Sequence, residues 1–410
     1  MRKTQTPYFM RLSMAMAIVL CLTANAAAAV KSVPQELAPA FEQLLSLAGE
    51  TDPKAPAAEI LAPLIEFLNR AKDPDTTFSM GERKGAASNY SEFRIDRSLK
   101  DVLDLIYNPD IPSYLTTPAS IRLSQWLHIN GGQQELPKLS KFLDHLSDPV
   151  MFTGVEFVEN TPDTFSGAYY AYQLDRALLL TRYKGRNVLF SISRQRNKSD
   201  VGKKGLVLGD DENWNYLYTA EKGCTKPGLG WADTYMYDSA AITVYFEEDA
   251  PTPQVRCGVF KWLRAGWANM NFVQPHHIQS GAQRFATTLK ALIESPALSD
   301  INGFSRAIRQ IGDLPVEILR QKVKRHYLGL QRIYQGHNRL IQSWFDNFSG
   351  QNGYLAKMSP EEMKAVLEKA YLKKILGKSP PADAGENTAE LRNKVIHKAQ
   401  AGPDKFRGPW

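Results

Sequence analysis

The sequence has few cysteines and lacks the short motifs that mark common catalytic and nucleotide-binding sites. Only three cysteines occur in 410 residues. No Gly-x-Ser-x-Gly, His-Glu-x-x-His, paired Cys-x-x-Cys or Gly-x-Gly-x-x-Gly is present. These absences remove the usual signatures of serine hydrolases, zinc proteases and dinucleotide-binding proteins. The sequence therefore predicts neither a metal site nor a cofactor.

The chain also lacks a strong excess of charge. Its formal net charge is +7, from 50 basic and 43 acidic residues. Three of the basic residues, Arg2, Lys3 and Arg11, lie in the first 29 positions, which hold no acidic residue. The remainder thus carries a net charge of only about +4, too little to indicate nucleic-acid binding.

The one long apolar run lies at the start of the chain. A basic start precedes the apolar residues 12–22, and Ala24-Asn25-Ala26 follows as a small-x-small cleavage site. The run is shorter than the roughly 20 apolar residues that a membrane-spanning helix needs. We therefore expect a signal peptide over residues 1–29 and a periplasmic or secreted protein.

Cysteine use agrees with export. Once Cys21 leaves with the signal peptide, Cys224 and Cys257 remain as a pair. In an oxidising compartment such a pair predicts a disulfide, here closing a loop of about 34 residues. The alternative is two separate buried thiols.

The periodicity of apolar residues divides the chain into five parts. They recur at helical spacing near both ends and at alternate positions between residues 150 and 272. A single core stops growing at about 250–300 residues, so we expect one main domain with helical additions. The parts are the signal peptide at 1–29, an N-terminal helical segment at 30–77, an α+β domain at 78–296, a C-terminal helical segment at 297–377 and a flexible tail at 378–410.

Aromatic residues are concentrated in the predicted sheet. Twelve of them lie between positions 214 and 272, a higher density than the 10% of the whole chain. Large rings with a polar edge suit either a packed core or the wall of a cavity that binds amphipathic ligands. The candidate pocket residues are Trp214, Tyr216, Tyr218, Trp231, Tyr235, Tyr245, Phe260, Trp262 and Arg194.

The end of the predicted sheet resembles a known family. Phe260-Lys261-Trp262-Leu263 is followed by Arg264-Ala265-Gly266-Trp267, then by Pro275 and a predicted helix over 276–294. START-like lipid-binding domains carry a strand, a Gly-Trp-containing turn and a final helix in this order, and the chain resembles them over about residues 78–296. The resemblance implies an α+β helix-grip fold, in which a curved antiparallel sheet wraps a long helix and leaves a pocket between them.

The function expected on this basis is binding of a hydrophobic or amphipathic small molecule, such as a lipid, without catalysis. Burial of apolar ligand surface between the sheet and the closing helix would supply the affinity. Arg194 and Tyr235 are the candidates to hold a polar head group.

Two alternatives stay open. An envelope hydrolase would use His276 or His277 with a carboxylate such as Asp233 or Asp238. A structural envelope protein would instead dimerise through the amphipathic helix predicted over 315–348, whose arginine-bearing face also suits peripheral contact with anionic lipid.

Overall fold

The computed structural model describes residues 31–70, 78–133, 135–162, 167–226, 230–336, 339–348 and 353–378. The predicted signal peptide at 1–29 and all but the first residue of the predicted tail lie outside the described residues. None of the described helices is both long and apolar enough to cross a membrane.

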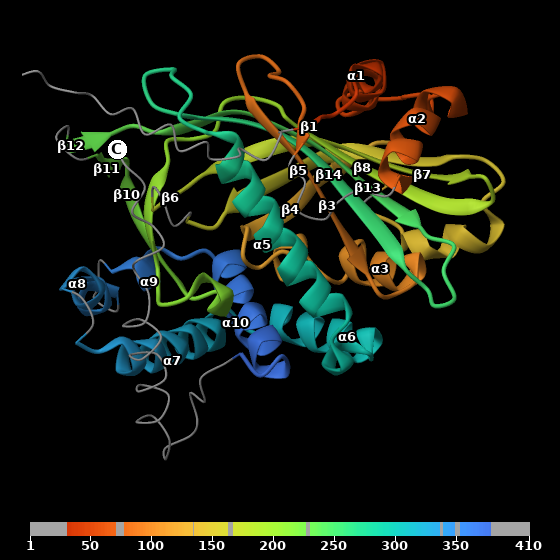
Figure 1. Cartoon of the computed structure of the whole chain (residues 1–410). Coiled ribbons are helices and arrows are strands. Elements are labelled where there is room, and N and C mark those ends of the chain that lie inside the picture. The colour runs from red at the N-terminus through yellow and green to blue at the C-terminus, as the bar shows by residue number, and fades with distance from the viewer. Residues whose placement is uncertain are drawn as a thin grey trace, which may run out of the picture.

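A nine-stranded sheet forms the centre of the protein (Figure 1), and all its pairings are antiparallel except that of β1 with β2. Its strand order is β1-β2-β3-β14-β13-β8-β7-β5-β4, so the first long strand pairs with the last. The bounds are β1 Lys31–Ser32, β2 Phe78–Ser79, β3 Ala87–Ile95, β4 Ile121–Ile129, β5 Val150–Asn160, β7 Ala171–Tyr183, β8 Arg186–Gln195, β13 Tyr235–Glu247 and β14 Val255–Gly266.

Two small sheets stand apart from the central one, so the strands predicted between residues 150 and 272 do not all belong to a single sheet. One has the order β10-β9-β6, and the other pairs β11 with β12. Their bounds are β6 Ala168–Tyr169, β9 Lys203–Val207, β10 Tyr216–Lys222, β11 Cys224–Lys226 and β12 Gly230–Ala232.

Helices cover both faces of the central sheet and form the C-terminal segment. The α-helices are α1 Ala38–Leu47, α2 Ala58–Asn69, α3 Leu99–Ile106, α4 Ser113–Thr116, α5 Pro275–Ile293, α6 Ile301–Gly312, α7 Val316–Tyr334, α8 Arg339–Phe348, α9 Tyr354–Lys357 and α10 Pro360–Ile375. The 3-10 helices of the described residues are η1 Gln35–Leu37, η2 Leu139–His145, η3 Asp211–Asn213 and η4 Pro296–Leu298.

The outer face of the sheet, which packs against α1 and α2, is a closed apolar core. Alternate residues of a strand point to opposite faces, and on β13 the outward residues Ala240, Ile242 and Val244 are all 0% exposed. Phe41 of α1 lies against two rings of β14, with ring centroids 4.9 Å from Phe260 and 5.4 Å from Trp262. The two N-terminal helices therefore seal this face.

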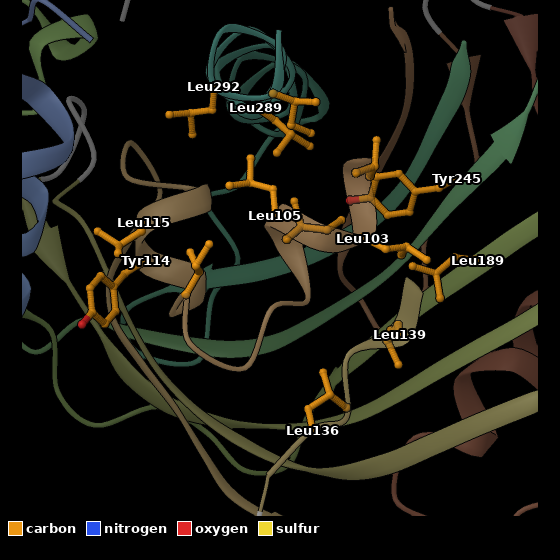
Figure 2. Packing of buried hydrophobic residues seen from close by; sticks show 14 of the residues in the cluster. Leu103, Leu105, Tyr114, Leu115, Leu136, Leu139, Leu189, Tyr245, Leu289 and Leu292 are labelled. Atoms are coloured by element: carbon orange, nitrogen blue, oxygen red, sulfur yellow. The ribbon is translucent and has the colours of Figure 1, made fainter. Parts of the chain in front are cut away.

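The inner face, which α3, α4 and α5 cover, is closed only in part. Leucines of α3 and of the second half of α5 pack together above the sheet, as Figure 2 shows. This part of the core includes Leu103, Leu105, Leu189, Tyr245, Leu289 and Leu292. Leu289 is 0% exposed, so the end of α5 is firmly packed.

Helix α5 runs along β3 and is tied to the sheet edge near each of its ends. Before it begins, the Asn271 side chain donates a hydrogen bond of 3.1 Å to the Gly85 carbonyl. After it ends, the Glu294 carboxylate accepts one of 2.8 Å from the Asp96 backbone N–H. The predicted closing helix is confirmed, and it packs against β3.

The helix predicted over 315–348 is wrong as one continuous element. It is divided into α7 and α8, and Gly336, whose φ is +83°, lies between them in a left-handed conformation that glycine adopts without strain. The apolar stripe is buried against the segment around β9 and β10. This cluster includes Leu208, Leu217, Leu319, Val323, Tyr327, Trp344 and Phe348. The stripe is thus used inside the chain, and neither a dimer nor a membrane contact through it is shown.

The predicted disulfide between Cys224 and Cys257 is also not formed in the described part of the chain. Cys257 is a free thiol, 0% exposed, and its strand neighbours are Phe93 and Tyr245. Burial raises the pKa of this thiol well above its usual value. Cys224 begins β11 in a separate small sheet, and its side chain lies outside the described residues. The alternation that places Cys257 on the inner face points its sulfur into the core.

Replacing Leu289 with alanine should destabilise the protein by about 2–5 kcal/mol, because a buried leucine leaves a cavity when it is truncated. Urea unfolding measures this change. Leu328→Ala is the matched control, since Leu328 is 39% exposed and a surface substitution changes stability by about 0.5 kcal/mol or less. Equal stabilities of the two variants would contradict the packing described for α5.

Candidate ligand-binding site

A stretch of the inner face is open to solvent although it lies on the central strands. On β13 the outward residues are fully buried, whereas the inward residues Ala241 and Thr243 are partly exposed. Two positions further, Tyr245 is only 3% exposed. The inner face is therefore filled near the end of α5 and unfilled beside its first half.

One cross-strand row crosses this open stretch, and we call it the inner row. Its members are directly paired in register across six neighbouring strands, so their side chains share one face. In strand order they are Asn89, Lys261, Ala241, Ser193, Arg176 and Gly154. Small residues separate the two cations, which leaves space above the middle of the row.

The charge of Arg176 is balanced within the protein. Its Nη1 lies 2.8 Å from a carboxylate oxygen of Glu156, whose side chain is 4% exposed. Its Nη2 donates a hydrogen bond of 3.2 Å to the Ser191 hydroxyl, which also accepts one of 2.6 Å from Tyr107. The coulombic attraction of Glu156 helps to raise the pKa of Arg176, against desolvation. The positive charge at this end of the row is therefore paired with a carboxylate, while Arg176 Nε has no hydrogen-bond partner among the described residues.

Lys261 lacks such a counter-charge. Its ammonium donates a hydrogen bond of 2.7 Å to the Ser239 hydroxyl, and among the described residues no carboxylate forms an ion pair with it. Desolvation lowers the pKa of Lys261 to about 8, opposed by Asp238 and assisted by Arg176. The side chain nevertheless keeps partial exposure. A cation that is both desolvated and reachable lies in a recessed position, where an anion would be attracted.

Asn89, opposite Lys261 in the register, has donors to spare. It is 2% exposed, and its Oδ1 accepts a hydrogen bond of 2.8 Å from the Ser91 hydroxyl. Its Nδ2 has no hydrogen-bond partner in the described part of the protein. A buried donor without an acceptor costs about 1–3 kcal/mol, so this atom calls for an oxygen supplied from outside the chain.

Helix α5 completes the site from above, from its first turns to Phe285. The ring of Phe285 meets that of Phe93 at the edge of the open stretch, with centroids 5.8 Å apart. One turn earlier, Gly281 shares the helix face of Phe285 and of the buried Ile278. A methyl group added at Gly281 would meet no atom within 4 Å. Open space therefore adjoins this face of the helix as well.

The structure divides the predicted pocket residues between different places. Phe260 and Trp262 lie on the outer face beneath α1, away from α5. Tyr245 belongs to the filled part of the inner face, and Trp214, Tyr216 and Tyr218 share that cluster from the segment at β10, each 5% exposed. The rings that the sequence grouped together therefore do not form one wall.

The two predicted head-group residues are separated too. Arg194 lies on the outer face, where its Nη2 is 3.4 Å from a carboxylate oxygen of Asp175, close to Gly49 at the end of α1. Tyr235 begins β13 at the far end of the sheet, with the Lys198 ammonium 3.9 Å from its ring centroid. Trp231 lies in β12, and its side chain is outside the described residues.

The histidines proposed for a hydrolase lie at the start of α5, with ring centroids 4.0 Å apart. His277 caps the helix, because its Nδ1 accepts a hydrogen bond of 3.1 Å from the Gln274 backbone N–H. Asp238 lies 3.6 Å from Arg83, and Asp233 is exposed. Within the described residues, no group of three or more His, Cys, Asp or Glu side chains could hold a metal ion.

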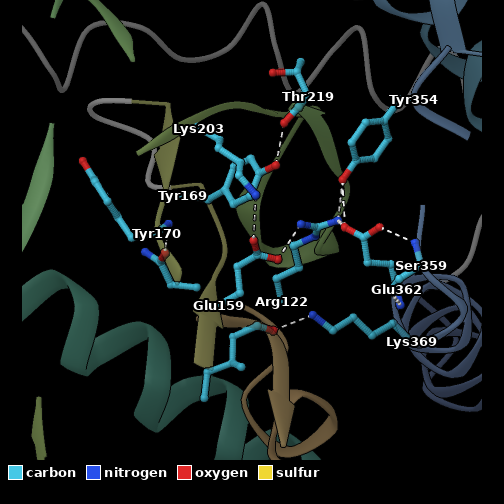
Figure 3. Close-up of polar contacts among 12 residues, drawn as sticks. Arg122, Glu159, Tyr169, Tyr170, Lys203, Thr219, Tyr354, Ser359, Glu362 and Lys369 are labelled. Atoms are coloured by element: carbon cyan, nitrogen blue, oxygen red, sulfur yellow. Dashed lines mark hydrogen bonds and ion pairs between the residues drawn. The ribbon is translucent and has the colours of Figure 1, made fainter. Parts of the chain in front are cut away.

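A second polar cluster joins the C-terminal segment to the sheet (Figure 3). Arg122 of β4, 5% exposed, forms ion pairs with Glu159 of β5 and Glu362 of α10. It also donates to the Tyr354 hydroxyl and lies 4.1 Å from the ring centroid of Tyr218. We call these five residues the Arg122 cluster. Its one cation lies between two carboxylates, and the Lys203 ammonium is a further 3.8 Å from Glu159, so the cluster is a structural connection.

Helix α10 adds two lysines to the same interface. The ammonium of Lys369 donates to the Ile121 carbonyl, and that of Lys373 donates to the Asn215 side chain. Desolvation lowers the pKa of Lys369 to about 7 and that of Lys373 to about 8. Burial of both lysines against the sheet domain therefore makes their protonated, charged forms less stable than in water.

The sheet order and the closing helix make this chain an α+β protein with the helix-grip arrangement. No model of a protein family matches it, and no curated protein does. Among solved structures it is similar to the human StarD13 (DLC2) lipid transfer and protein localization domain, with 10% identity, a TM-score of 0.26, and coverage of 59% of this chain and 100% of that one. Backbones that superpose this loosely transfer no ligand from one protein to the other.

Sequence reasoning missed Asn89, Lys261 and Arg176. The signal available was a lysine between two aromatic residues, Phe260 and Trp262, in an otherwise apolar strand. Strict alternation turns a lysine at this position away from the face of its neighbours. The face toward which Lys261 points is the inner one only because α1 and α2 cover the opposite face. No local sequence pattern reveals where these two helices pack.

Stability should rise with pH between about pH 7 and pH 9 through Lys369, because the unfolded lysine binds a proton in this range that the folded one has released. Lys369→Met should therefore flatten the slope of melting temperature against pH. The exposed Lys374 of the same helix, changed to methionine, is the matched control. An unchanged slope in Lys369→Met would refute the desolvation of this lysine.

Proposed function

We propose that the protein binds a hydrophobic or amphipathic small molecule between the inner row and the first half of α5. The observation that carries this proposal is the contrast on β13, where outward residues are fully buried and the inward Ala241 and Thr243 are reached by solvent. A stable fold normally fills such a face. A site lined by apolar surface with a few convergent polar groups is the usual form of a small-molecule pocket.

The chemistry of the site suits the binding of a small molecule. Val259 and Leu263 lie on the same face of β14 as Lys261, and Ile278 is a buried residue of the first half of α5, so the side chains around the row are apolar. Each methylene of a ligand removed from water contributes about 0.8 kcal/mol. The polar groups of the row stand at fixed positions, where they can orient a ligand head. Binding of a small molecule is therefore the function that this geometry supports best.

Gly281→Trp should reduce ligand binding at least about tenfold, because an indole would occupy the space beside the inner row while a helix tolerates tryptophan better than glycine. The measurement is displacement of the neutral fluorescent probe N-phenyl-1-naphthylamine by dodecan-1-ol, together with native mass spectrometry of protein purified from its own host.

Gly312→Trp is the matched control, since Gly312 ends α6 and a methyl group added there also meets no atom within 4 Å. It should bind as the unaltered protein does. Undiminished binding by Gly281→Trp, or no binding of probe and alcohol by the unaltered protein, would refute the proposed site.

Export through residues 1–29 is a further part of this proposal. It is supported by the basic start, the apolar run and the small-residue site ending at Ala26. N-terminal sequencing of protein recovered from the periplasm or the medium should find a chain that begins between residues 27 and 30. Recovery of the uncleaved chain from the cytoplasm would contradict export.

A further inference from the structure

The inner row has an uneven distribution of charge. Arg176 at one side has Glu156 as a partner 2.8 Å away. Lys261 at the other side has only the Ser239 hydroxyl at 2.7 Å, while Arg176 and Asp238 act on it from farther away. Taking a cation out of water without a counter-charge is costly. The site is therefore short of one negative charge next to Lys261.

A second observation points to the same spot. Asn89 and Lys261 are paired directly across β3 and β14, so their Cβ atoms lie about 4.5–5.5 Å apart. The bond from Ser91 to Asn89 Oδ1 turns the amide so that Nδ2 is the group left without a partner. An ammonium and an amide N–H₂ thus stand side by side, both as donors. The group that satisfies both is an oxygen-bearing anion.

Resting on the proposed function, we propose that the ligand is a long-chain monocarboxylate, whose carboxylate is held jointly by Lys261 Nζ and Asn89 Nδ2. Only one cation of the row lacks a partner in the described protein, which matches a single negative charge rather than the roughly two of a phosphate monoester. The carboxylate has two oxygens, one for each donor. The ion pair forms between desolvated groups, where it is strongest.

The residues around Lys261 and Asn89 are apolar, which suits the alkyl chain of such a ligand. Val259 and Leu263 flank Lys261 on the inner face of β14, two positions to either side. Ile278 and Phe285 approach from α5, and Gly281 between them leaves space. The alkyl chain would lie along this surface beneath the first half of α5. The carboxylate at one end would then remain at the inner row.

The experiment compares dodecanoate with dodecan-1-ol, which have the same chain length and differ in head group. Both compete at pH 7 against N-phenyl-1-naphthylamine for the full mature chain. The unaltered protein should bind dodecanoate at least about tenfold more tightly than the alcohol, the effect expected of one hydrogen-bonded charge pair. Equal affinities for acid and alcohol would overturn the inference and leave the proposed function standing. Binding of neither compound, nor of the probe, would overturn the proposed function itself.

Two variants assign the preference to its residues. Lys261→Met keeps the length of the side chain and should abolish the preference for dodecanoate without changing the affinity for the alcohol. Asn89→Asp is nearly isosteric and places a carboxylate opposite Lys261, so it should also remove the preference. Lys322→Met, at an exposed position of α7, is the control and should retain it. A tenfold preference that survives in both Lys261→Met and Asn89→Asp would overturn the assignment.

Discussion

The pairing of β3 with β14 is the interaction on which the rest of the structure depends. It joins residues 87–95 to residues 255–263 and so brings the first long strand beside the last. This ladder delivers the chain to the start of α5 at the edge of β3, where the helix turns back over the inner face. It also fixes Asn89 opposite Lys261. The fold and the candidate site are thus consequences of one long-range register.

The protein places its buried charges in two different ways. In the Arg122 cluster, one guanidinium meets two carboxylates, and the C-terminal helices are attached through it to the sheet. Removing one member of such a set leaves the others desolvated and alone, which is strongly destabilising. In the inner row, by contrast, an ammonium and an amide lie beneath α5 without acidic partners. The first arrangement holds the molecule together, and the second is the basis of the proposed ligand site.

Much of the fold could be predicted from the sequence, because elements depend on local periodicity. The closing helix and the antiparallel strands follow from short-range patterns. The site could not be predicted in the same way. The aromatic rings of Phe260 and Trp262 suggested a pocket wall, yet these rings lie on the face of the sheet that α1 and α2 cover. Lys261 then points to the other face, and only the packing of helices far away in sequence reveals which face stays open.

The two ends of α5 are packed to different extents, and this difference determines by which route a ligand could reach the inner face of the sheet. Its last turns are embedded among the leucines of α3, whereas the loop that leads into its first turn carries Met270 and Phe272 at 46% and 43% exposure. Partial opening follows the least costly path, and that path begins where fewest apolar contacts must be broken. The N-terminal end of α5 should therefore separate from the sheet first, while its C-terminal end stays packed and acts as the hinge. A ligand could then enter or leave without unfolding of the protein.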